Sequence, residues 1–215
     1  WVQGLRLLGE DVASDHAEAS LWAEWRNGSV LAVTPQKLVD GQLFGQTSWG
    51  GMVKIPLSEL AALDRRRGPF VDLTLMAPEQ KDFPASKVLD WSPKLSRSVE
   101  GRLLNLMRHT SSVGWGVKAP TVLAWKEQGP GVFSCWVGVD QEVRNHRETS
   151  PLVFRVLFDG VVVASSGPVS VRDSPKVLRG ELVGKGKLEL VCESFSDSRA
   201  GGSHGDWIAP RVWRK

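Results

Sequence analysis

The sequence predicts a mostly β protein in two parts: a small β meander or barrel over residues 1–66, followed by a β-sandwich of the jelly-roll type over residues 70–215. Short runs of alternating apolar and polar residues recur along the chain, which is typical of strands with one face in a core. Turns rich in glycine and proline separate these runs, and no long helical pattern follows residue 70. Many short strands joined in this way indicate a sandwich or jelly roll.

The N-terminal part is predicted to be a four-stranded meander. Three turn signals separate its β-rich runs: Asn27-Gly28, Asp40-Gly41 and Gly50-Gly51. Pro56 ends the last of these strands, and residues 57–63 are expected to form one or two helical turns capped by Ser58. A meander of this length cannot bury both faces, so we expect it to curl into a small barrel or to pack on a neighbour. The boundary is expected at residues 65–69.

The alternation is clearest in residues 131–143 of the C-terminal part. Its expected inward-facing residues are Phe133, Cys135, Val137 and Val139. An acidic turn, residues 140–142, follows this strand and either meets a ligand or closes a loop. Residues 152–158 and 187–192 alternate in the same way. Pro210 interrupts a final strand at 208–213, which indicates an edge or a bulge there.

Charge and hydropathy argue against two classes of partner. The net charge is only +3, from 27 basic and 24 acidic residues spread along the chain, whereas nucleic-acid binders concentrate their positive charge. We therefore expect no nucleic-acid partner, and RNA binding by the N-terminal barrel is the remotest alternative. No apolar run is long enough to span a membrane.

The aromatic residues and cysteines leave alternatives open. Ten tryptophans and no tyrosine suit flat sugar-binding faces, but tryptophan is also a common core residue. Cys135 and Cys192 are either two buried thiols or one disulfide formed in an oxidising compartment, and their spacing does not decide between these. Two cysteines without a nearby histidine do not make a zinc site.

Four motifs in order resemble the NPCBM family of carbohydrate-binding modules, which are often attached to glycoside hydrolases. They are Gly114–Pro120, Val137–Asp140, Val153–Gly160 and His204–Trp207. The resemblance covers residues 71–213 and implies a galactose-binding-like β-sandwich that binds galactose-type sugars in some members, with calcium in some. The N-terminal part is similar, more loosely, to the small Sm-like or SH3-like segments that precede such domains in some bacterial envelope proteins.

The family's motifs transfer to this chain with two departures. Its Gly-x-Gly-x-His run falls on residues 114–118, and Lys118 stands where the family usually has histidine. Its Gly-x-Asp matches at residues 138–140. Its Asp-His-x-Asp-Trp run falls on residues 203–207, where Ser203 replaces the first aspartate and the other named residues match. Both departures change groups suited to sugar or cation ligation.

A sugar site needs flat apolar area and fixed donors and acceptors for hydroxyls. The candidate sugar-binding residues are Trp115, Lys118, Asp140, His204, Asp206 and Trp207. Trp115 lies between two glycines, which favours a loop tip, although it would also suit a packing role. Asp206 and Trp207 would otherwise cap a turn and enter the core, and Asp140 would close its own turn through an Asx bond. No cofactor is expected apart from calcium, and no run supplies the roughly six to eight oxygens that calcium prefers.

An enzyme is not expected. Asp140 and Glu142 resemble a glycosidase pair only in spacing, since no cleft-forming insertions surround them and no hydrolase motif is present. The sequence predicts a non-catalytic carbohydrate-binding module of an envelope or secreted protein, extracellular or periplasmic. The alternative is a structural or protein-interaction module of the envelope that has lost its sugar pocket and binds a protein partner.

Overall fold

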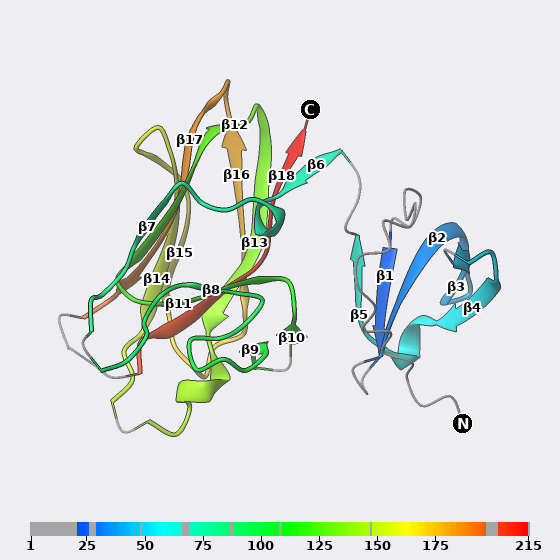
Figure 1. Cartoon of the computed structure of the whole chain (residues 1–215), viewed down its shortest axis with the longest axis horizontal. Coiled ribbons are helices and arrows are strands. Elements are labelled where there is room, and N and C mark those ends of the chain that lie inside the picture. Colours follow the sequence, from blue (N-terminus) through cyan, green and yellow to red (C-terminus); the bar gives the residue numbers. More distant parts are fainter. Residues whose placement is uncertain are drawn as a thin grey trace. The chain divides into compact units, whose positions relative to one another are not determined.

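A computed structural model describes residues 21–25, 29–47, 49–65, 69–86, 88–107, 109–146, 148–196 and 202–214. The chain divides into two compact units, residues 1–68 and 69–215, and each is described here by itself (Figure 1). The predicted turn at Asn27-Gly28 lies outside the described residues. Within them, no helix is long and apolar enough to cross a membrane.

The first unit contains a five-stranded antiparallel sheet in the order β4-β3-β2-β1-β5. Its strands are β1 Leu21–Trp25, β2 Val30–Val39, β3 Gln42–Thr47, β4 Met52–Pro56 and β5 Leu60–Arg65. The hairpin predicted at Asp40-Gly41 is confirmed, with φ of 48° and 69° at its two residues, as a tight two-residue turn requires. The small core of this first unit is built from Ala23, Val33, Leu43 and Ile55.

The helical turns predicted for residues 57–63 are wrong for most of that stretch. Only Leu57–Glu59 forms a 3-10 turn, and Pro56 rather than Ser58 occupies its N-cap, without a side-chain hydrogen bond. Residues from Leu60 onward pair with β1 instead. A short isolated helix is marginal in water, so the backbone hydrogen bonds available at the edge of β1 decide the conformation.

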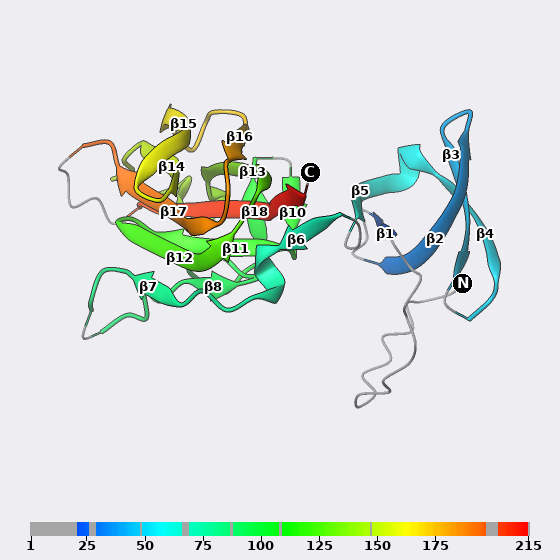
Figure 2. The same ribbon diagram turned by 90° about the horizontal axis from the view of Figure 1, so that it is seen from above.

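The second unit is a sandwich of two antiparallel sheets (Figure 1 and Figure 2). One sheet has the order β16-β13-β18-β11-β8, with β6 also paired to β18, and the other has the order β15-β14-β17-β12-β7. The strands of the first sheet are β6 Phe70–Asp72, β8 Lys94–Leu95, β11 Gly114–Lys118, β13 Gly131–Val139, β16 Lys176–Leu182 and β18 His204–Arg214. Those of the second are β7 Gln80–Asp82, β12 Thr121–Gln128, β14 Leu152–Phe158, β15 Val161–Val169 and β17 Gly186–Ser194.

The predicted alternation of β13 is confirmed. All four of its expected inward-facing residues are buried in the core between the sheets, whereas Trp136 is 46% exposed. Cys135 and Cys192 are both buried free thiols. The last strand, β18, is longer than predicted. Pro210 lies at a bulge in it, since the register with β13 shifts there and the neighbouring Ala209 has a φ of 49°.

A further layer covers the outer face of the six-stranded sheet. It contains a small two-stranded sheet, β9 Leu104–Leu106 and β10 His109–Ser111. Leu104 and Leu106 form a second apolar cluster with Ile208 of β18. The six-stranded sheet is therefore covered on both faces where β11 and β18 run side by side.

Candidate functional site

The pairing of β11 with β18 sorts the predicted site residues onto two faces. Lys118 pairs with His204, and Trp115 pairs with Trp207. Successive side chains of a strand point to opposite faces of a sheet. Lys118, His204 and Asp206 therefore share the outer face, while Trp115 and Trp207 point into the sandwich.

Trp115 is not at a loop tip, and that expectation is wrong. It is 3% exposed, belongs to the core between the sheets, and lies on a strand paired on both sides, with β18 and with β8. The neighbouring Gly116 instead leaves room for the covering layer, since a Cβ there would lie 2.3 Å from the carbonyl oxygen of Arg97. Trp207 is fully buried and packs edge-on against Phe154, with ring centroids 5.2 Å apart.

Asp140 and Asp206 form a buried pair of carboxyl groups beneath the covering layer. The backbone N–H of Asn105 donates to Oδ2 of both residues, at 3.1 Å each. Desolvation raises the pKa of Asp140, and raises that of Asp206 well above its ordinary value with a further contribution from the charge of Asp140. Asp140 also accepts from the N–H of Glu142 at 2.7 Å. The predicted Asx bond is thus confirmed, and it begins the 3-10 turn η3, Gln141–Val143.

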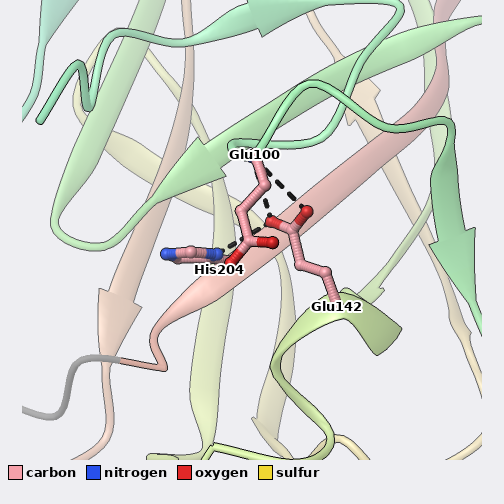
Figure 3. Close-up of side chains that lie close together, drawn as sticks. All are labelled: Glu100, Glu142 and His204. Atoms are coloured by element: carbon pink, nitrogen blue, oxygen red, sulfur yellow. Dashed lines mark hydrogen bonds and ion pairs between the residues drawn. The ribbon is translucent and has the colours of Figure 1, made fainter.

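His204 is held by Glu142 from that turn (Figure 3). Nδ1 of His204 lies 2.8 Å from Oε1 of Glu142, and the two side chains are 2% and 1% exposed. The hydroxyl of Ser98 also donates to Glu142. Desolvation alone would raise the pKa of Glu142, but the hydrogen bonds from His204 and Ser98 outweigh it, and the net pKa lies below its usual value. The ring of His204 is thereby fixed in orientation.

The other nitrogen of His204 has different surroundings. Nε2 is buried and has no hydrogen-bond partner in the part of the chain that the structure describes. The indole of Trp91 lies beside the ring, with centroids 5.7 Å apart, and His146 meets the ring edge-on at 6.2 Å. A buried polar atom without a partner is uncommon, and an ordered water or a ligand can supply the missing hydrogen bond.

Lys118 lies on the same side. Its Nζ donates to Oγ of Ser203 at 3.1 Å and lies 4.6 Å from the centroid of the Trp91 ring. The side chain is largely buried, and desolvation lowers the pKa of its ammonium group. The two departures from the family motifs, Lys118 and Ser203, are therefore direct neighbours that bond to each other.

The structure thus gathers four of the six predicted residues, Lys118, Asp140, His204 and Asp206, at one end of β11 and β18. It adds Trp91 and Glu142 to them. Trp91 comes from residues 77–100, where Pro78, Pro84 and Pro93 prevent long regular elements, and its indole ring is the only signal in the sequence. The sequence indicates Glu142 only as half of a carboxylate pair with glycosidase-like spacing.

One group of side chains at this end has metal-ligating chemistry. Glu100, Glu142 and His204 each bring one ligand atom, and these atoms lie within 4.8 Å of one another (Figure 3). The set does not fit calcium, because it includes a histidine nitrogen and supplies far fewer than the roughly six to eight oxygens that this ion takes. Nδ1 of His204 and the Glu142 carboxylate already bind each other.

Comparisons with known proteins point to one family and one fold. The family model described as NPCBM/NEW2 domain matches residues 80–213. Among curated proteins, no relative of this chain is found. A CBM51 from Clostridium perfringens GH95, in complex with methyl-galactose, has a TM-score of 0.55 and 22% identity, over 66% of this chain and 99% of that one.

Two longer structures share the same fold. CBM51-2 and INT domains of Clostridium perfringens ZmpB, in complex with GlcNAc, have a TM-score of 0.60 and 16% identity over 90% of this chain. The tandem CBM51 modules of Sp3GH98 from Streptococcus pneumoniae SP3-BS71 have a TM-score of 0.57 and 15% identity over 80% of it. This chain spans 43% and 59% of those two chains, respectively.

Proposed function

The chain belongs to the NPCBM/NEW2 family. From this premise we propose that it is a non-catalytic module that binds carbohydrate at the end of β11 and β18 where Lys118 and His204 lie. The resemblance predicted from the sequence motifs is confirmed. Galactose-type sugars are the first candidates, since a neighbour in fold was solved with methyl-galactose and another with GlcNAc. We also propose that the chain lies outside the cytoplasm, as a module of an envelope or secreted protein.

Nε2 of His204 is the observation on which the proposal depends. Glu142 fixes the ring through Nδ1, so Nε2 is held in one position before any ligand arrives. A sugar hydroxyl can both donate and accept, and so can complete the hydrogen bonding of this atom in either tautomer. A buried atom of this kind that gains a partner on binding contributes both affinity and specificity.

Trp91 supplies the flat apolar surface. Its half-buried indole lies beside the imidazole of His204. In this proposal the indole moves aside to let the sugar reach the histidine and then packs against the sugar ring. Together with residues 83–86 and 88–90, Trp91 lines an open hollow with a volume of about 510 Å³. The indole therefore has open space on one side.

The carboxylates at this end support a binding role rather than catalysis. Asp140 caps η3 and shares the Asn105 amide with Asp206, while Glu142 holds His204. A glycosidase needs two carboxyl groups that face the scissile bond across a cleft. Here both Asp140 and Glu142 are engaged with the protein itself.

Glycan-array binding of the purified chain tests the proposal. We expect retention of at least one glycan by the unaltered protein and its loss in His204→Ala. Lys126→Ala, an exposed change on β12 of the other sheet, should bind as the unaltered protein does. Absence of binding to every glycan by a folded chain would overturn the proposal, and would favour the alternative of a structural module that binds a protein.

We also infer that residues 1–66 form a small barrel of the SH3 or Sm type. Three features support this: β1 lies between β2 and β5, the long strand β2 has a register shift between Pro35 and Lys37, and a 3-10 turn precedes β5. A bulge of this kind bends a strand and allows a short sheet to curl on itself.

A further inference from the structure

We propose that Lys118 makes this site selective for acidic sugars, whose carboxylate binds Nζ of Lys118 while a hydroxyl binds His204. The inference rests on the proposed function and names the class of sugar. It begins from the pairing of Lys118 with His204 across β11 and β18. Side chains that are directly opposite on neighbouring strands have Cβ atoms about 5 Å apart and point to the same face, so one sugar ring can contact both.

The ammonium group of Lys118 is held in place rather than free to follow solvent. Its partners include the hydroxyl of Ser203 at 3.1 Å and the face of the Trp91 ring at 4.6 Å. The side chain is largely buried and has lost hydration, and this desolvation lowers the pKa of the ammonium group.

Four acidic side chains lie at this end of the sheet: Asp140 and Asp206 share the backbone N–H of Asn105, and Glu142 and Glu100 have donors of their own. Glu142 receives hydrogen bonds from Ser98 and His204 on the Nδ1 side of the imidazole. Glu100 lies 3.5 Å from the guanidinium of Arg102 and 3.7 Å from Nε2 of His146. The repulsion that they would exert on a bound anion is therefore reduced.

Trp91 connects Lys118 to His204, because its indole touches both. A sugar that displaces the indole to reach Nε2 of His204 also removes the ring from Nζ of Lys118. A neutral sugar replaces that cation–π contact with an ordinary hydroxyl hydrogen bond, whereas a carboxylate replaces it with a charge-assisted one, which is stronger. Partial burial keeps the charge interaction from being fully screened by salt.

Calorimetric titration of the full chain with two matched probe pairs tests the inference. The pairs are methyl galactoside with methyl galacturonide, and methyl glucoside with methyl glucuronide, which differ within each pair only at C6. We expect the acid of the preferred pair to bind about tenfold to a hundredfold more tightly than its neutral partner, as charge-assisted hydrogen bonds allow. The advantage should shrink in high salt.

Substitutions assign the preference to one residue. In Lys118→Met the ratio of acid to neutral affinity should fall to about one, and in Lys118→Arg, which keeps the charge, the ratio should stay above one. Lys185→Met, an exposed change between β16 and β17, should leave the ratio unchanged. Equal binding of acid and neutral sugars by the unaltered chain would overturn this inference alone, whereas failure of every probe and of the glycan array would overturn the proposed function.

Discussion

The carboxyl groups of Asp140 and Asp206 accept hydrogen bonds from the same backbone N–H, that of Asn105, at 3.1 Å each. The two residues come from the end of β13 and from β18, and Asn105 belongs to the covering layer. One amide thus ties three segments that are distant in the sequence. Two buried carboxyl groups this close cannot both ionise without a large cost, so we expect the folded protein to keep a proton on the pair.

The proton on this pair makes stability depend on pH. Desolvation raises the folded-state pKa of both groups above 3.8, so their contribution is complete below the unfolded pKa and is lost as pH rises through the folded values. We expect the melting temperature to fall, as pH rises above the unfolded pKa, more steeply than in Asp206→Asn. The amide of asparagine always carries a hydrogen-bond donor, whereas the carboxyl group of Asp206 carries one only when it is protonated.

The control for this prediction is Asp173→Asn. Asp173 is exposed, and backbone hydrogen bonding from Ser170 lowers its pKa, so its linkage has the opposite sign. The slope above about pH 5 should therefore match that of the unaltered chain. Melting curves with the same slope in Asp206→Asn and in the unaltered protein would show that the pair does not hold a proton.

Glu142→Gln should weaken both the fold and the site. It removes the charge that receives hydrogen bonds from His204 and Ser98 inside the protein, at an expected cost of about 1–3 kcal/mol. Because the pKa of Glu142 is lowered in the folded state, its contribution is present above the unfolded pKa and disappears as pH falls. Denaturant unfolding at neutral and acidic pH measures this difference.

Glycan binding should fall in the same variant, because His204 is no longer held in one orientation. Glu148→Gln alters an exposed carboxylate and should change neither stability nor binding measurably. If Glu142→Gln binds glycan as tightly as the unaltered chain, the carboxylate does not position the histidine.

Gly116→Ala should destabilise the second unit more than Gly138→Ala does. An alanine Cβ at position 116 would lie 2.3 Å from the carbonyl oxygen of Arg97, which is backbone and must move. At position 138 the nearest atom is a side-chain methyl of Leu106 at 3.0 Å, which can rotate. We expect a loss of about 1–3 kcal/mol for the first change and less for the second. Equal losses in denaturant unfolding would argue against close packing of the covering layer on β11.

The sandwich could be predicted because its strands carry a local pattern. β13 and β14 alternate over seven or more residues, and the buried face is visible without any neighbour. β5 could not be predicted in this way. Its residues follow a proline and resemble a short helix, and only pairing with β1 makes them a strand.

The site was predictable in part for the same reason. Lys118, Asp140, His204 and Asp206 belong to motifs on strands, so the pairing of β11, β13 and β18 brings them together. Trp91 lies in an irregular segment, and its contact with His204 depends on long-range packing. The glycines beside Trp115 suggested flexibility, but they provide space for the covering layer.

Substitutions at Trp91 test whether its indole contacts the sugar or only packs against the protein. We expect Trp91→Ala to weaken glycan binding by at least about tenfold, because the aromatic face that would cover the sugar is lost. Trp91→Phe keeps an aromatic face and should bind more tightly than the alanine variant. It removes the indole that moves on binding, so the change in tryptophan fluorescence on adding sugar should disappear in both variants.

Trp136→Phe is the matched control for the fluorescence measurement. Trp136 is 46% exposed on β13, and its ring lies against His109 rather than against His204. The fluorescence change should therefore persist in this variant at nearly the original amplitude. The indole that responds to sugar is the one that the sugar contacts. If the fluorescence change survives in Trp91→Phe but is abolished in Trp136→Phe, the sugar binds at the exposed face of β13 and not at His204.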